Sequence, residues 1–511
     1  MDMEKKVLTL GQDPDWFWTM LEQGKNDNVK KQEVSQKQTE NCVEATSLVE
    51  QTKERIASES ASKCPIDNFE LTEFGNALRL VQKHGRDLKY VCQEKRWRFW
   101  DGKRWCLDDR GRILNLAKEL MEELFKNAKA SDEKYVKDFH ARFFNGCQTL
   151  RDIETMIRLA QIDPAVSSLV GDFDKDPLLL NVQNGTFDFK TGKLMPHARE
   201  KLMTKICPIE YMPKAQCPKW LAFLEQILIE KELLDYIQRA VGLALTGDVS
   251  EQVFFILYGL GANGKSTFIN VLMSLFGDYA MQTPTSTLMV KNSTAMSNDI
   301  ARLLGTRFVA ATEGEEGQRL SEVLIKRLTG GDKITARFLF KEYFEFYPTF
   351  KIFLATNYRP NIKGLDHGIW RRINSIPFIV TIPDDEQNKK LTTELLEELP
   401  GILNWALQGY LEWQKVGLNP PIQVRAAVED YRNEMDTINI FIDEKCKVDA
   451  NLTCGAAEIY ATFKGWCLHH HEFVHSRKVF VSNLESRGFT RKRSGADGQW
   501  RWQGFCLLPT I

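Results

Sequence analysis

One short stretch of the chain, GLGANGKST, has the residue types and the spacing needed to bind phosphate. It fits the Walker A pattern G-x-x-x-x-G-K-[ST] in full. In such a loop backbone N–H groups converge on phosphate oxygens, the lysine adds a positive charge, and the serine hydroxyl can bind Mg²⁺. An apolar run at 253–257 precedes the loop and a helical pattern follows it, so the helix N-terminus would face the anion. We expect a nucleotide site formed by Gly259, Gly261, Ala262, Asn263, Gly264, Lys265, Ser266 and Thr267.

Two later β-type runs end in side chains that could act on a bound triphosphate. The run at 307–312 ends at Glu313, whose carboxylate could lie near Mg²⁺ and orient the attacking water. Glu315 and Glu316 follow closely, and an acidic surface loop is the plain alternative for all three. The run at 350–356 ends at Asn357, an amide that could hold the lytic water or simply form a turn.

Basic residues flank the last of these runs on both sides. Arg371 and Arg372, in GIWRRIN, could stabilise transition-state charge on a triphosphate held by a neighbouring subunit, or form surface ion pairs. Before the run, a Gly-Gly-Asp turn and β-type segments at 334–340 and 343–347 predict a hairpin with Lys341 at its tip. A lysine there could contact a nucleic-acid backbone without reading its sequence, although an oligomer contact is equally compatible.

Composition limits the class of protein. The chain has 511 residues, which favours two to four domains, and its 68 basic residues balance 69 acidic ones. No apolar stretch approaches the roughly 20 residues that span a bilayer, and no signal peptide is evident, so we expect a cytoplasmic protein without membrane contact. The 11 cysteines include no C-x-x-C pair and predict neither a disulfide framework nor a zinc ribbon.

Positive charge is concentrated near the C-terminus. Residues 475–501 hold seven Lys or Arg against two acids, which could form a phosphate-attracting face or a solvated surface. The candidate DNA contacts are Arg477, Lys478, Arg491, Lys492 and Arg493. A second candidate, the tryptophan-rich hairpin at 97–105, is more typical of core packing than of base stacking.

The order Walker A, strand-plus-Glu, G-G-D hairpin, strand-plus-Asn and R-R resembles superfamily 3 helicases, and more narrowly the phage, plasmid and poxvirus primase-helicase family. The segments RFWDGKRW and LLLNVQNGTFDFKTGKL resemble the region before the helicase in that family, and residues 459–507 resemble its C-terminal winged helix. The resemblance implies an α/β P-loop NTPase with an AAA+-like superfamily 3 core, an α+β N-terminal domain and a winged-helix domain.

The same resemblance implies a domain plan and a function. We expect a flexible extension at 1–68, an α+β domain at 69–215, the ATPase at 216–385, a helical part at 386–450 and the winged helix at 451–511. The implied activity is ATP-dependent replicative unwinding by a homo-hexamer on single-stranded or forked DNA, with Mg²⁺ held by Ser266 and Glu313. The alternative is an ATP-dependent replication initiator or regulator without processive unwinding. The short region before residue 69 lacks a primase pattern, so a separate primase or polymerase would supply primers.

Overall fold

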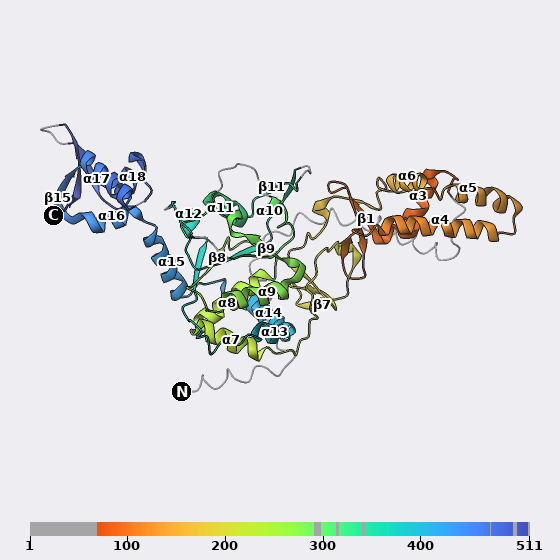
Figure 1. The fold of residues 1–511 in the computed structure, drawn as a ribbon, viewed down its shortest axis with the longest axis horizontal. Helices are drawn as coiled ribbons and strands as arrows, with labels where there is room; N and C mark the ends of the chain where they lie inside the picture. The colour runs from red at the N-terminus through yellow and green to blue at the C-terminus, as the bar shows by residue number, and fades with distance from the viewer. Residues whose placement is uncertain are drawn as a thin grey trace, which may run out of the picture.

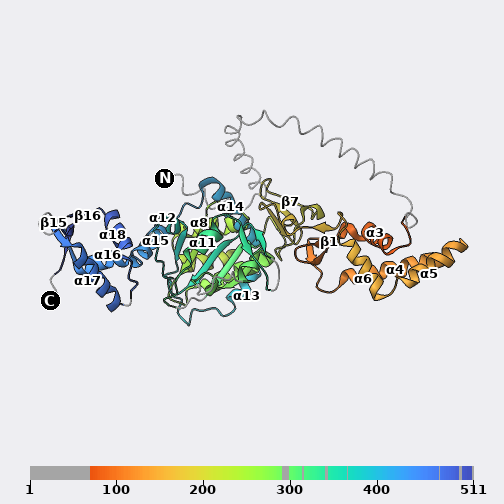
Figure 2. The same cartoon turned by 90° about the horizontal axis from the view of Figure 1, so that it is seen from above.

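The computed structural model describes residues 69–290, 298–312, 316–339, 343–364, 366–470, 472–493 and 498–508. Figure 1 shows three units in a row: a helical N-terminal unit, a central α/β unit, and a small C-terminal unit reached through α15 (Ile422–Glu434). Figure 2 shows the same elongated order from above. The expected extension at 1–68 lies outside the described residues. None of the helices in these ranges is long and apolar enough to cross a membrane.

The N-terminal unit packs helices against one face of a small sheet. Its strands run in the order β3-β2-β1-β4, and the turn at Asp101–Arg104 joins β2 to β3, as the tryptophan-rich hairpin predicts. The tryptophans of this hairpin, Trp97, Trp100 and Trp105, are buried, so they pack in cores and are not open to stacking on bases. The elements are α3 (Glu73–His84), β1 (Leu88–Val91), β2 (Arg96–Trp100), β3 (Trp105–Leu107), α4 (Arg112–Ala130), η4 (Val136–His140), α5 (Ala141–Gly146), α6 (Leu150–Ala160) and β4 (Ser167–Ser168).

The next three strands belong by packing to the central unit. The antiparallel strands β5 (Leu179–Val182), β6 (Gly185–Asp188) and β7 (Lys193–Met195) form a small sheet joined by short turns. Leu180, Val182 and Phe187, however, lie in the same hydrophobic cluster as the helices that flank the central sheet. The expected boundary at residue 215 therefore does not coincide with the packing, which joins β5 and β6 to the central core.

A five-stranded parallel sheet organises the central unit, and the chain is a mixed α/β protein. Its strand order is β14-β8-β13-β10-β9. Successive side chains of a strand point to opposite faces; accordingly Phe255 and Leu257 of β8 enter one hydrophobic cluster while Phe254 and Ile256 enter the other. Both faces are covered, which explains why the strands read as continuous apolar runs. The strands are β8 (Phe254–Tyr258), β9 (Ala280–Pro284), β10 (Phe308–Thr312), β13 (Lys351–Thr356) and β14 (Ile373–Pro377).

The helices divide between the two faces of this sheet (Figure 1). One face carries α7 (Pro218–Leu228), α8 (Lys231–Ala244), α9 (Lys265–Phe276), α13 (Leu391–Leu396) and α14 (Leu399–Val416). The other carries α10 (Asn298–Ala301), α11 (Glu322–Thr329), α12 (His367–Trp370) and the hairpin of β11 (Ile334–Ala336) and β12 (Phe344–Phe346). This hairpin is confirmed, with Ile334 opposite Phe346, although its strands are shorter than predicted.

Helices α8 and α14 touch through glycines. A Cβ added to Gly409 would lie 1.9 Å from the carbonyl oxygen of Gln238, and one added to Gly242 would lie 2.1 Å from the backbone nitrogen of Tyr410. Both positions therefore require glycine, because any side chain would force the two helices apart.

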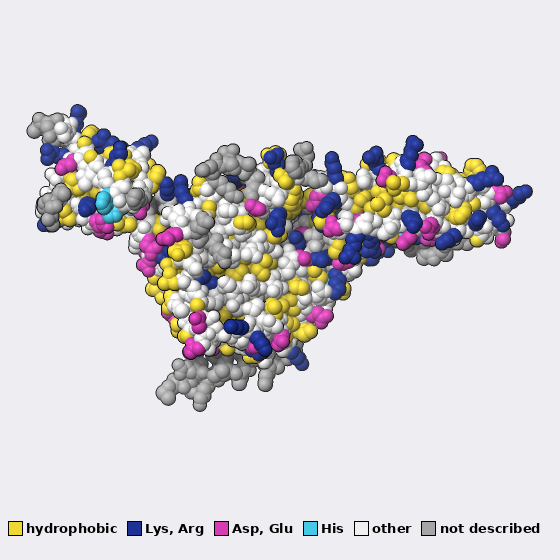
Figure 3. Space-filling model, viewed as in Figure 1, with side chains coloured by type: hydrophobic (Ala, Val, Ile, Leu, Met, Phe, Trp, Pro, Cys, Tyr) yellow, Lys and Arg dark blue, Asp and Glu magenta, His cyan; other side chains and the backbone are white. Residues whose placement is uncertain are grey.

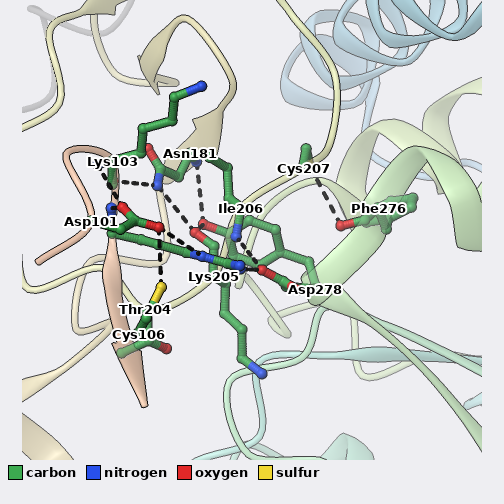
Figure 4. A network of polar contacts seen from close by, with 12 residues as sticks. Asp101, Lys103, Cys106, Asn181, Thr204, Lys205, Ile206, Cys207, Phe276 and Asp278 are labelled. Atoms are coloured by element: carbon green, nitrogen blue, oxygen red, sulfur yellow. Dashed lines mark hydrogen bonds and ion pairs between the residues drawn. The ribbon is translucent and has the colours of Figure 1, made fainter. Parts of the chain in front are cut away.

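The N-terminal and central units are joined by a polar network at the far end of α9 (Figure 4). Asp278, just beyond that helix, accepts a hydrogen bond from the backbone N–H of Ile206 (3.1 Å) and forms an ion pair with Arg104 of the β2–β3 turn. The side-chain amide of Asn181 donates to the carbonyl oxygens of Lys103 (2.9 Å) and Lys205 (3.2 Å). Asn181 is fully buried whereas Arg104 and Asp278 are partly exposed, so the network extends from the folded interior to the surface.

The C-terminal unit follows the order helix, strand, helix, helix, strand, strand, around its own hydrophobic cluster. Its sheet runs β15-β17-β16. Ile438 and Phe441 of the first helix lie in this cluster, so the unit begins before the expected boundary at 451. Its elements are α16 (Thr437–Lys445), β15 (Cys446–Gly455), α17 (Ala456–His469), α18 (Arg477–Ser486), β16 (Thr490–Arg493) and β17 (Trp500–Leu507).

Candidate nucleotide site

The phosphate-type loop connects the carboxyl end of β8 to the first residue of α9, Lys265. Gly261 and Gly264 adopt left-handed backbone conformations (φ 118° and 79°), which glycine adopts without a steric penalty. A Cβ on Gly264 would lie 2.7 Å from Ile227 Cγ2, and one on Gly259 would lie 2.2 Å from the carbonyl oxygen of Phe378. The glycine spacing of the motif is thus explained by the close approach of α7 and the chain after β14.

The loop holds its shape through two further contacts. Ala262 also has a positive φ of 45°, a conformation that costs a non-glycine residue energy. Its carbonyl oxygen accepts a hydrogen bond from the backbone N–H of Ile382 (2.7 Å), and Asn263 donates to the carbonyl of Phe378 (3.2 Å). The segment after β14 therefore fixes the strained loop before any ligand arrives.

Lys265 is buried, with its ammonium group enclosed by oxygen atoms. Its Nζ donates to the carbonyl of Gly259 (2.6 Å), to Asn263 Oδ1 (2.9 Å) and to Asn357 Oδ1 (3.1 Å). Burial disfavours the charged form and lowers the pKa of Lys265 to about 8. The lysine thus carries a charge at neutral pH that an anion would stabilise further.

The predicted residues of two strand ends meet this loop at one edge of the sheet. Strands β8, β10 and β13 are parallel, so their carboxyl ends share that edge. Ser266, Asn357 and Thr312, the last described residue of β10 before Glu313, line one cavity of about 990 Å³. Glu313 itself lies outside the described residues, as does Glu315, and the role assigned to Glu313 stays a prediction. Glu316 is exposed in the turn that follows.

The cavity extends beyond the motif residues. Part of its lining comes from α7, with Phe223 and Gln226, and another part from Ile382 and Leu391. An ion pair between Lys219 and Glu394 (3.7 Å) connects the two parts. Sequence reasoning missed these residues, because no motif marks them and they meet only through the packing of α7 and α13 around α9.

Arg371 and Arg372 lie at the opposite edge of the sheet. Strand β14 pairs in parallel with β8, with Ile373 opposite Phe254, and the carbonyl of Arg372 accepts a hydrogen bond from the N–H of Phe254 (2.7 Å). The arginines therefore precede the amino ends of these strands, whereas the phosphate-type loop follows their carboxyl ends. At about 3.3 Å per residue the two sites are separated by roughly 15–20 Å along the strands.

The two arginines differ in exposure. Arg372 is buried and donates to Thr329 Oγ1 (3.1 Å), to the carbonyl of Gly368 (2.6 Å) and to Gln252 Oε1 (3.0 Å). Burial lowers the pKa of Arg372, with neighbouring Arg371 adding to the shift. Arg371 is exposed and shares the Gln252 acceptor. Sequence reasoning missed Gln252, whose positive φ of 53° is not visible in the sequence.

The remaining basic candidates are separate from this cavity. Arg477 and Lys478 are exposed in the first turn of α18, and Arg491, Lys492 and Arg493 are exposed along β16. Arg491 pairs with Glu485 (3.3 Å) and lies over the Trp500 ring. The tip residue Lys341 lies outside the described residues, between β11 and β12. Within the described ranges no group of three or more His, Cys, Asp or Glu side chains could hold a metal ion.

Two family models match the chain. The model described as D5 N terminal like matches residues 77–229, and a family of unknown function (DUF5906) matches residues 257–372, which contain the loop, the hairpin and both arginines.

Relatives occur among large DNA viruses. "Putative helicase L207/L206" of Acanthamoeba polyphaga mimivirus is 30% identical over 321 residues, covering 58% of this chain and 33% of that protein. "Putative helicase 022R" of Frog virus 3 is 23% identical, covering 57% of this chain and 39% of that protein. "Putative primase C962R" of African swine fever virus is 25% identical, covering 69% and 38%. The chain thus spans between a third and two fifths of the length of these relatives.

These matches support the predicted relationship of the chain to primase-helicases. Among solved structures, the apo C-terminal region of NrS-1 (residues 305–718) has a TM-score of 0.48 at 11% identity, covering 85% of this chain and 99% of that one.

Proposed function

We propose that the chain is an ATP-dependent replicative DNA helicase that works as a homo-hexameric ring on single-stranded DNA at forked duplexes. The observation that carries the proposal is the meeting of Lys265, Ser266 and Asn357 around one cavity, while Arg371 is exposed at the far edge of the same sheet. The names of the viral relatives, helicase and primase, support the same activity class. In this proposal the central unit is a P-loop NTPase of the superfamily 3 type.

The cavity suits a nucleoside triphosphate bound through its phosphates. Lys265 would exchange its carbonyl and amide partners for phosphate oxygens, and the loop N–H groups would complete the cradle. Releasing Lys265 also frees the side chain of Asn357 to orient water near the γ-phosphate. Ser266, which lines the cavity, would hold Mg²⁺ together with Glu313; the ion, when bound, neutralises phosphate charge.

The arginine that completes the site comes from a neighbouring subunit. Arg371 cannot reach the loop of its own chain, because the length of the central strands separates them. Arg371 is the better candidate for the arginine finger because its side chain is exposed. Arg372 makes three hydrogen bonds to its own chain and would instead hold this segment in place. ATP would then bind between two copies of the chain.

DNA contacts are assigned to two elements. Lys341, at the tip of the β11–β12 hairpin, would grip the backbone of the strand inside the ring. The order of elements from α16 to β17 supports a winged helix, in which Arg477 and Lys478 of α18 and the basic strand β16 face DNA. A separate primase or polymerase would supply primer synthesis. The alternative is an initiator or regulator that uses the same ATPase for assembly on DNA without processive unwinding.

The test compares ATP hydrolysis with and without single-stranded DNA, and unwinding of a forked duplex. Lys265→Ala should abolish both, whereas Lys126→Ala, an exposed lysine on α4, should change neither. DNA-independent hydrolysis without strand separation would overturn the helicase proposal, and DNA-stimulated hydrolysis without unwinding would favour the initiator. Mixing Arg371→Ala with Lys265→Ala subunits should restore part of the ATPase activity. Wherever the nucleotide site of an Arg371→Ala subunit faces the arginine of a Lys265→Ala subunit, both Lys265 and Arg371 are present.

A further inference from the structure

The sheet of the N-terminal unit has one face covered by helices, while the other carries cations beside a small hydrophobic cluster that includes Val91 and Trp100. Leu88, Trp97 and Phe99 point into the helical core. Residues on the opposite face alternate with these along the strands, as the pleat requires, and include Lys89 of β1 and Arg96 and Arg98 of β2. Lys89 stands directly opposite Arg98 in the register.

A recess of about 380 Å³ adjoins this row of cations. Its lining includes three cations, Arg86 just beyond α3, Lys89 and Arg199, together with the carboxylate of Glu200 and the apolar side chains of Val81, Trp105 and Leu202. We call the five residues Arg86, Lys89, Arg96, Arg98 and Arg199 the basic face.

Acidic neighbours neutralise only part of the basic face. Arg199 pairs with Asp87 and Arg98 with Glu94 (3.0 Å), while Arg96 forms a long, exposed pair with Asp109 (3.6 Å), a type worth little in water. Arg86 and Lys89 form no ion pair among the described residues; Lys89 is half-buried, its Nζ donates to the carbonyl of Ala165 (2.7 Å), and the carboxylate of Asp172 favours its charged form.

The surrounding chain adds to the positive charge. Residues 83–112 contain ten Lys or Arg against five Asp or Glu, and residues 193–205 contain four against one, although the whole chain is nearly neutral. Figure 3 shows Lys and Arg side chains gathered over the β1–β3 region, between the helical end and the central unit. A polyanion is the partner that such a surface attracts.

We propose that the basic face binds the phosphodiester backbone of DNA outside the ATPase unit, without reading its sequence. The aromatic residues that could have stacked on bases, Trp97, Trp100 and Trp105, are buried, so phosphate is the chemical group left for this surface to recognise. The choice of DNA as the polyanion rests on the proposed function. The junction of Arg104 and Asp278 fixes this surface to α9, and hence to the nucleotide site.

The test measures DNA affinity of the full chain against salt concentration, without nucleotide. The double variant Arg86→Ala/Arg96→Ala removes two exposed cations, and should reduce the slope of log K against log salt by about 1.8 for duplex DNA or about 1.4 for a single strand. The control, Lys126→Ala/Lys137→Ala, removes the same charge from the distal helical part of the same unit and should leave the slope unchanged.

An unchanged slope and affinity in the Arg86→Ala/Arg96→Ala variant would overturn the proposal, as would an equal loss in the control. Because the affinity measurement needs no ATP, its outcome is independent of whether the proposed ATPase and helicase activity is correct. If wild-type protein neither hydrolyses ATP nor unwinds DNA while the difference in slope persists, the proposed function fails and the DNA surface stands. If unwinding is intact but the slopes agree, only the surface fails.

Discussion

The buried state of Lys265 predicts that nucleotide affinity depends on pH above neutrality. In the free protein burial lowers the pKa of this lysine to about 8, so the group loses its proton between pH 7 and 9. Phosphate oxygens favour the charged form and should return the pKa to its ordinary range near 10. Binding at pH 9 must therefore be accompanied by proton uptake, and the affinity falls as pH rises.

The size of the effect follows from the titration. With a pKa of about 8, roughly a tenth of the lysine is protonated at pH 9 and nearly nine tenths at pH 7, so Kd should rise about tenfold over that interval. The phosphate groups themselves are almost fully ionised throughout, since their second pKa is near 6.

Calorimetric titration with a nucleotide in two buffers of different ionisation enthalpy measures both Kd and proton uptake. Lys265→Arg is the matched control, because a guanidinium stays charged across this range, and its pH dependence should disappear. A Kd that is constant from pH 7 to 9, with no proton taken up at pH 8.5, would refute the link between burial and affinity.

Two further predictions concern stability. Arg372→Ala should lower the free energy of unfolding by about 3 kcal/mol, because it leaves buried partners on Thr329 and Gly368 unsatisfied, whereas exposed Arg371→Ala should change it by less than about 0.5 kcal/mol. Urea titrations check this, and equal losses would contradict the different roles given to the two arginines. Gly409→Ala should cost about 3 kcal/mol through its clash with Gln238, while Gly465→Ala on α17, with nothing within 4 Å, should stabilise by up to about 1 kcal/mol. Thermal melts compare the two variants, and similar Tm values would contradict the claim that a side chain at position 409 cannot be accommodated between α8 and α14.

The sequence predicted the elements whose signal is local. The apolar run before Gly259, the runs ending at Thr312 and Asn357, and the turns at Asn184–Gly185 and Asp101–Gly102 each depend on a few neighbouring residues, and the structure contains the strands they indicate. Continuous helical patterns were harder to divide. The helical pattern from 218 to 246 forms two helices, because Ile229, with a positive φ of 51°, interrupts it between α7 and α8.

Long-range packing was not accessible in the same way. The placement of β5 and β6 in the central core, and of α16 in the C-terminal unit, depends on contacts between distant segments. The same is true of the cavity wall at Ile382 and Leu391, and of Gln252 beneath the two arginines. Motif spacing locates the phosphate loop, but the walls around it come from residues without a pattern of their own.

The anchoring of α9 at both ends has a mechanical consequence. The helix starts at the phosphate-type loop and ends at the polar junction with the β2–β3 turn, and its 12 residues form a rod of about 18 Å. A tilt of about 5° at the loop would move the far end by roughly 1.6 Å, more than a hydrogen bond can stretch before it breaks. The N-terminal unit therefore has to move with the helix or lose its contacts with Asp278, so α9 couples the phosphate-type loop mechanically to the N-terminal unit.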